Sequence, residues 1–66
     1  MHLLVNGATL ELPDGASVLQ LIERMQLAGK RLAVEINGEI VTRSLHAQTV
    51  LRPDDRVEIV QAIGGG

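Results

Sequence analysis

The chain has 66 residues, enough for one small domain with a single hydrophobic core. It contains no cysteine, so disulfide bonds, thiolate metal ligands and a cysteine nucleophile are excluded. The net charge is −2, and there is neither a basic stripe nor an aromatic side chain, which argues against a nucleic-acid-binding protein. No apolar run is long enough to span a membrane, and we expect a cytoplasmic protein that is monomeric when free.

The core must be aliphatic, because 45% of the residues are hydrophobic and none of them is Phe, Trp or Tyr. Fully burying one aliphatic side chain contributes roughly 1.5–3 kcal/mol, so about a dozen must be buried to offset the lost chain entropy. Met25 is expected in this core rather than at a cofactor, since methionine commonly fills gaps between aliphatic side chains.

The first predicted element is a β-hairpin. A short apolar strand precedes Asn6-Gly7, the pair favoured in type I′ turns because both positions need a positive φ. The alternation that follows places Leu10 and Leu12 on one face of the returning strand. A proline- and glycine-containing turn at residues 13–15 ends that strand.

A helix is predicted to start at Ser17, whose hydroxyl can cap it while Gln20 completes a capping box. Apolar residues recur at helical spacing after the cap and predict a buried stripe. Gly29 is the expected end, because glycine readily takes the left-handed C′ conformation. The stripe consists of Val18, Leu19, Leu21, Ile22 and Met25.

Three strands are predicted in the second half of the chain. Leu32–Ile36 and Glu39–Val41 are joined by a second Asn-Gly turn. Between them and the last strand, Ser44 is expected to cap one helical turn that carries Leu45. The last strand, Val57–Ile63, is the most continuously apolar, which indicates a central strand with both faces at least partly covered.

This order of elements predicts an α+β fold in which one helix crosses one face of a mixed sheet of four to five strands. A right-handed crossover places the last strand beside the first, in mid-sheet and held on both sides. The arrangement is the β-grasp, or ubiquitin-like, fold. We expect it to span residues 1–63, followed by a flexible tail at residues 64–66.

No residue pattern indicates catalysis or metal binding. His2 and His46 lack metal-ligand spacing, and we interpret them as surface or structural residues. Ser17 is a helix cap without a neighbouring base. Asp54 and Asp55 belong to a solvated turn rather than a catalytic dyad. The chain is therefore predicted not to be an enzyme.

The candidate reactive group is the C-terminal carboxylate of Gly66. Together with Gly64 and Gly65, this residue lacks a Cβ, so the segment can enter a narrow cleft without a steric clash. The alternative is a frayed terminus without a function, which is common at chain ends. Because a carboxylate is a poor acyl donor, an ATP-dependent adenylating enzyme would have to activate it.

A docking surface for such an enzyme is also predicted. Because strand residues alternate between the faces of a sheet, Leu4, Val60 and Ala62 are expected on the face opposite the helix. An exposed apolar patch there suits a partner protein. Ordinary scattered surface aliphatics are an equally good interpretation of the same residues.

These features resemble the ThiS-type sulfur carriers of thiamine biosynthesis, a family of ubiquitin-like sulfur carriers. One departure is Asp55, at a turn where these carriers often have glycine in an Asp-Gly-Asp sequence. Besides the opening hairpin, the resemblance rests on four segments: Ser17–Leu19, Leu32–Gly38, Val41–Arg43 and Val57–Gly66.

The resemblance implies that Gly66 carries sulfur. A ThiF-type adenylyltransferase would use ATP and Mg²⁺ to form an acyl-adenylate on Gly66, and a sulfur donor system would convert it to a thiocarboxylate through a persulfide. A ThiG-type thiazole synthase would accept the sulfur, while Gly64 and Gly65 give access to both partner sites. The chain itself is expected to bind no cofactor.

Three alternatives stay open. The small subunit of molybdopterin synthase shares the fold and the diglycine end, although the short length and the Ile63–Gly66 ending favour thiamine. A protein-conjugating modifier would instead form a covalent lysine adduct. A non-reactive β-grasp binding module would not depend on its glycine tail.

Overall fold

A computed structural model describes residues 1–61 of the chain. Its two β-hairpins form at the Asn-Gly pairs. The φ angles of Asn6 and Gly7 are 50° and 83°, and those of Asn37 and Gly38 are 51° and 87°. A type I′ turn requires such positive values at both central positions. Both hairpin predictions are therefore confirmed.

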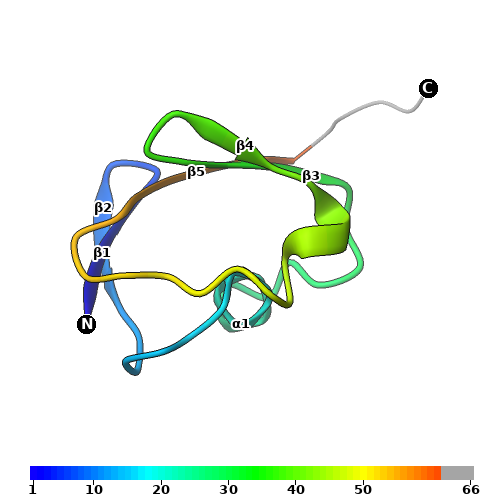
Figure 1. The fold of residues 1–66 in the computed structure, drawn as a ribbon. Coiled ribbons are helices and arrows are strands. Elements are labelled where there is room, and N and C mark those ends of the chain that lie inside the picture. The colour runs from blue at the N-terminus through cyan, green and yellow to red at the C-terminus, as the bar shows by residue number, and fades with distance from the viewer. Residues whose placement is uncertain (62–66) are drawn as a thin grey trace.

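The sheet is mixed, and its strand order is β2-β1-β5-β3-β4 (Figure 1). The last strand thus lies in the middle, parallel to β1 and antiparallel to β3. The β-grasp prediction is confirmed, including the place of the last strand beside the first. The five strands are β1 His2–Val5, β2 Ala8–Glu11, β3 Leu32–Ile36, β4 Glu39–Val41 and β5 Arg56–Gln61.

The helix α1, Val18–Arg24, starts at the predicted cap. The Oγ of Ser17 accepts a hydrogen bond from the N–H of Gln20 at 3.2 Å. In return, the Oε1 of Gln20 accepts one from the N–H of Ser17 at 2.8 Å. The capping box therefore satisfies two N–H groups that have no partner within the helix.

The end of α1 lies earlier than predicted. Gln26, not Gly29, takes the left-handed C′ conformation, with a φ of 61°. The N–H of Leu27 then donates to the carbonyl of Ile22 at 3.0 Å, which completes a Schellman motif. Leu27 packs against the core, and this contact sets the helix end in place of a glycine. Gly29 belongs to the next turn, closed by the bond from the N–H of Lys30 to the carbonyl of Leu27 at 3.1 Å.

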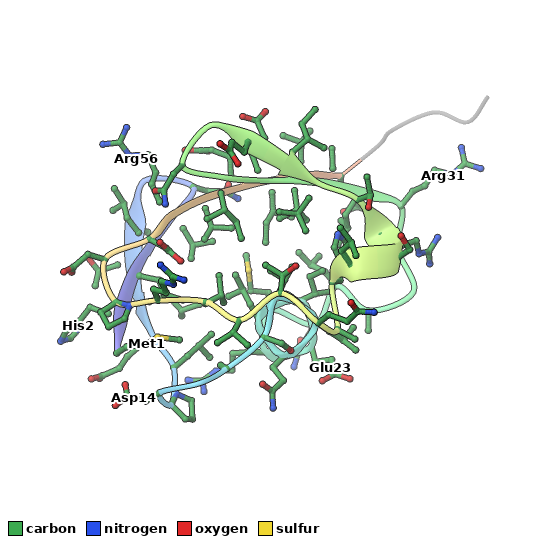
Figure 2. All side chains as sticks on the ribbon, viewed as in Figure 1. Met1, His2, Asp14, Glu23, Arg31 and Arg56 are labelled. Carbon is green, nitrogen blue, oxygen red and sulfur yellow. The ribbon has the colours of Figure 1, made fainter. Side chains whose placement is uncertain are left out.

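The core lies between α1 and the sheet, and Figure 2 shows carbon-rich side chains filling this layer. Every buried hydrophobic residue in it is aliphatic, as the composition predicts. The helical stripe is narrower than predicted, because Leu19 is 37% exposed on a flank of α1 while Met25 is half-buried against the core. The buried set is Leu3, Val5, Leu12, Ala16, Val18, Leu21, Ile22, Val34, Leu51, Val57 and Ile59.

The segment between β4 and β5 contains a single 3₁₀ turn, η1, at Arg43–Leu45. Its cap position is Thr42 rather than the predicted Ser44, and Thr42 makes no side-chain capping bond. The chain then returns past the start of α1 (Figure 1, yellow), where the N–H of Leu51 donates to the carbonyl of Ala16 at 2.8 Å. This return buries Leu51 in the core.

Candidate functional site

The candidate site begins where the described part of β5 ends, at Gln61. On the β3 side, Leu32 lies opposite Gln61 and Ala33 lies opposite Val60, so pairing continues to the last described residue. On the β1 side, backbone strand pairing covers only the start of β5. The prediction that the tail leaves a strand held on both sides is therefore wrong for Gln61, because β1 turns away before β5 ends.

The side chain of Asn6 continues the hydrogen bonding between β1 and β5 beyond the paired residues, to Ile59. Its Oδ1 accepts from the N–H of Ile59 at 2.7 Å, and its Nδ2 donates to the carbonyl of Ile59 at 3.1 Å. A primary amide offers the same donor and acceptor as a peptide group, so it replaces the next β1 residue in the ladder. Each bond of this kind contributes about 0.5–1.5 kcal/mol net.

Asn37 holds the other side of β5 in a similar way. Its Oδ1 accepts from the N–H of Arg56 at 3.0 Å, and its own N–H donates to the carbonyl of Arg56 at 2.8 Å. The two turn asparagines therefore fix the register of β5 from both neighbouring hairpins. Sequence reasoning interpreted them only as turn formers, because Asp-Gly or Gly-Gly would predict the same turns.

The turn before β5 departs from expectation at a different residue. Asp54, not Asp55, has a positive φ, 69°, which is the conformation that a glycine would adopt without strain. The carboxylate of Asp55 accepts from the N–H of Arg52 at 2.8 Å and from the Nδ2 of Asn37 at 3.0 Å. The interpretation of Asp55 as the glycine replacement is thus wrong, while the turn itself is confirmed.

The outer face of the sheet carries two of the three predicted docking residues. Leu4 is half-buried and Val60 is 63% exposed, whereas the adjacent Val5 and Ile59 are buried. Ala62 lies outside the described residues. Because the outward side chains of β5 are exposed in residues 56–61, the prediction of a strand covered on both faces is wrong for this part of the chain.

Leu4 and Val60 do not form one contiguous patch. Leu4 lies opposite Arg56 on β5, and Glu58 separates Arg56 from Val60 along the same face. The apolar residue directly opposite Val60 is Ala33 on β3, whereas Ile40 on β4 lies opposite Glu35, further from the end of β5. The pair near the end of β5, Ala33 and Val60, is named here the exit cluster.

The histidines have the surface and structural roles that the sequence predicts. His2 is exposed, with its Nε2 3.8 Å from the Oε1 of Glu11. His46 is buried, with its Nε2 3.1 Å from the carbonyl oxygen of Val41. Within residues 1–61, no three His, Cys, Asp or Glu residues gather as a metal site would require. In the same range, no helix has the length and hydrophobicity needed to cross a bilayer.

The predicted reactive segment cannot be placed in this geometry. Gly66, the predicted sulfur-carrying residue, and Gly64 and Gly65, the predicted access residues, all lie outside the described residues. Their roles stay predictions. The structure describes the strand that leads to them and the contacts that fix it.

The fold and this site define a small β-grasp domain whose last strand is fixed in register at the centre of the sheet. A family model described as the ThiS family matches residues 3–66, and the chain belongs to that family. The resemblance found in the sequence is therefore confirmed.

Similar proteins agree with this assignment. The chain is 30% identical to the sulfur carrier protein ThiS of Escherichia coli (strain K12), and the match covers all of both chains. A crystal structure of a thiamine biosynthesis protein (ThiS) from Geobacter metallireducens matches with a TM-score of 0.84 and 30% identity over the full length of both. A thiazole synthase of Paramagnetospirillum magneticum is 36% identical over 66 residues, and the chain spans only 20% of that protein's length.

Proposed function

We propose that the chain is a sulfur carrier of thiamine biosynthesis and that its C-terminal residue, Gly66, is converted to a thiocarboxylate. The family match carries the proposal, because it runs through residue 66 and so includes the glycine tail. The relative named as a sulfur carrier protein aligns over its whole length, which supports the same role. The chain is then a co-substrate of other enzymes rather than an enzyme.

The carboxylate of Gly66 has to be activated before it can accept sulfur. One carboxylate oxygen attacks the α-phosphorus of ATP, pyrophosphate leaves, and an acyl-adenylate remains. The terminal sulfur of a persulfide attacks the acyl carbon and expels AMP. A thiol then reduces the resulting acyl disulfide and releases the thiocarboxylate. ATP and Mg²⁺ belong to a ThiF-type adenylyltransferase, where the metal ion neutralises phosphate charge.

The described residues supply recognition and positioning for this chemistry. Displacing a reacting group by about 1 Å can cost on the order of 100-fold in rate, so the starting point of the tail has to be reproducible. The amides of Asn6 and Asn37 fix β5, and with it the point at which the chain continues beyond Gln61. Docking of the enzyme on Leu4, Val60 and Ala62, joined by Ala33 of the exit cluster, would hold the sheet against the enzyme surface.

A ThiG-type thiazole synthase is the proposed sulfur acceptor. Two proteins named thiazole synthase, from Paramagnetospirillum magneticum and Magnetococcus marinus, match this chain over one fifth of their length. A carrier-like stretch in the same polypeptide as the synthase would keep donor and acceptor at high effective concentration. This arrangement supports direct sulfur transfer between the two. Dependence on ATP and the lack of cysteine favour a cytoplasmic location.

Adenylation can be tested directly with the ThiF-type enzyme, ATP and Mg²⁺ by measuring pyrophosphate release. Deleting Gly66 withdraws the carboxylate by about 3.5 Å, so we expect the rate to fall at least about 100-fold. An unchanged melting temperature would show that the domain is still folded. Equal rates for the two chains would contradict the assignment of Gly66.

The alternatives make different predictions in the same experiments. A carrier for molybdopterin would co-purify with the large subunit of molybdopterin synthase instead of thiazole synthase. A conjugating modifier would yield a lysine adduct. A non-reactive binding module would lose nothing when Gly65 and Gly66 are removed.

A further inference from the structure

A pocket of about 210 Å³ opens next to the end of β5, between the end of α1 and η1. Leu32, one of its wall residues, lies opposite Gln61, so the pocket adjoins the point where the described chain ends. Figure 2 shows Arg31, the residue before Leu32, projecting at this same end of the molecule. The apolar wall consists of Leu19, Ile22, Leu27 and Leu32.

The charged side chains around this pocket are all cationic. Among residues 1–61, the lining includes Lys30 and Arg43 and no carboxylate, although the chain as a whole has a net charge of −2. Neither cation forms an ion pair with any residue in 1–61. Two other hollows have mixed linings, with Arg52, Glu39 and Asp55 in one and Arg24, Asp14 and Glu23 in the other. We name the first hollow the cationic pocket.

Hydrogen bonds hold the walls of the cationic pocket in place. The ring of His46 contacts the carbonyl of Val41 at 3.1 Å, and the carbonyl of His46 accepts from the N–H of Leu19 at 3.0 Å. On the opposite wall, the N–H of Lys30 donates to the carbonyl of Leu27 at 3.1 Å. A pocket that is already formed costs a partner less conformational entropy on binding.

The size and the charge of the cationic pocket define what it can hold. Ligand sites for nucleotides and drug-sized molecules usually occupy about 300–1,000 Å³, so 210 Å³ suits one or two side chains instead. The apolar wall favours an aliphatic or aromatic side chain, and Lys30 and Arg43 favour a carboxylate next to it.

We infer that the cationic pocket binds an acidic, apolar segment of the adenylyltransferase while the tail lies in that enzyme's active site. The inference rests on the proposed function, because it assigns a second contact to the same enzyme. It differs from docking on the exit cluster, since the pocket lies at the helix side of the molecule and not on the outer face of the sheet. Exposed ion pairs with two cations add modest affinity and steer association.

The test is the KM of the adenylyltransferase for variants of this chain. In the double variant Lys30→Gln/Arg43→Gln, we expect KM to rise about tenfold with kcat unchanged. Both charge contacts contribute to binding of the chain and not to the chemical step. The matched control is Arg24→Gln/Arg52→Gln, which removes the same charge at residues that line the two other hollows and should leave KM unchanged. Leu19→Gln should also raise KM, because it removes part of the apolar wall. Leu19 is exposed and glutamine is compatible with a helix, so this variant should stay folded.

Salt provides a second readout. Raising the ionic strength should increase the KM of the wild-type chain more than that of the Lys30→Gln/Arg43→Gln variant, because screening acts on contacts that the variant has already lost. Unchanged circular dichroism and melting temperature would show that both double variants are folded.

The outcomes separate this inference from the proposed function. If the wild-type chain is adenylated and the Lys30→Gln/Arg43→Gln variant has the same KM, the inference fails and the proposed function stands. If the wild-type chain is not adenylated, both fail. A lower KM for the variant would also overturn the inference, because it would mean that the pocket holds a competing group, such as the chain's own C-terminal segment.

Discussion

At the scale of single residues, the asparagine side chains at the hairpin turns have two functions. Each takes a positive φ that allows the turn, and the Oδ1 of each accepts a hydrogen bond from β5. The Nδ2 of Asn6 also donates to β5, whereas that of Asn37 donates to the carboxylate of Asp55. Aspartate tolerates the same turn conformation but has no donor when ionised. The amide is therefore the chemical feature that connects the turns to the central strand.

Asn6→Asp isolates this contribution. The turn is retained, but the carbonyl of Ile59 loses its donor and faces a carboxylate oxygen instead. We expect the free energy of unfolding to fall by about 1–3 kcal/mol, measured by urea denaturation. Gln48→Glu makes the same amide-to-carboxylate change at an exposed residue and serves as the control. An equal decrease in the free energy of unfolding of the two variants would contradict a specific role for the Asn6 amide.

Residue-scale predictions from the sequence succeed where the signal is local. The Asn-Gly pairs and the Ser17 and Gln20 capping box involve neighbours in the chain, and both are confirmed. The hydrogen bond between Asn6 and Ile59 joins residues 53 positions apart, so no pattern of neighbouring residues predicts it. The turn before β5 has its positive φ at Asp54 rather than Asp55, and one sequence does not show which of two adjacent turn positions takes that conformation.

At the scale of elements, tertiary packing decides what propensity leaves open. The helix α1 ends at a Schellman motif built on Gln26 because Leu27 reaches the core, although Gly29 is the better left-handed residue. For β5, the apolar run suggests burial on both faces, yet Arg56 and Glu58 mark its outer face as exposed. The alternation of polar and apolar residues along β5 is therefore a more reliable signal than the number of apolar residues in the run.

Val60→Asp tests the outer face of β5 as a docking surface. Val60 is 63% exposed, so we expect the domain to stay folded, with at most about 1 kcal/mol lost from the strand. Adenylation should be blocked, because a carboxylate would have to be desolvated against the enzyme. The measurement is pyrophosphate release with the ThiF-type enzyme.

Val50→Asp is the matched control for this prediction. It makes the same change at a valine of similar exposure, 57%, in the segment that returns past α1. Normal adenylation of the Val50 variant with loss in the Val60 variant would support docking through the exit cluster. A normal rate for Val60→Asp would count against it.

At the scale of the whole molecule, the β-grasp topology brings the end of the chain to the centre of the sheet. The last strand is inserted between β1 and β3, and the two Asn-Gly turns flank it from neighbouring hairpins. The exit cluster and the cationic pocket lie near the same end of β5 on different sides of the molecule. A partner enzyme could therefore contact the domain on two surfaces while it acts on the tail.

The sequence predicts this topology because the order of strands and helix allows few right-handed arrangements. It does not predict the cationic pocket, whose lining comes from α1, the turn after it, and the segment around η1. Lys30 and Arg43 are distant in the chain and look like ordinary surface cations. The fold brings them together in one pocket with Leu32, which lies opposite Gln61, and this position gives them a candidate role.

The central claim is that Gly66 carries sulfur as a thiocarboxylate, and intact-mass spectrometry tests it most directly. The chain is incubated with ATP, Mg²⁺, the ThiF-type adenylyltransferase and a persulfide sulfur source. The account predicts that one terminal oxygen is replaced by sulfur, with fragmentation placing the change on Gly66, and that the product disappears when Gly66 is deleted. An unchanged mass, under conditions that convert a known sulfur carrier, would contradict the account.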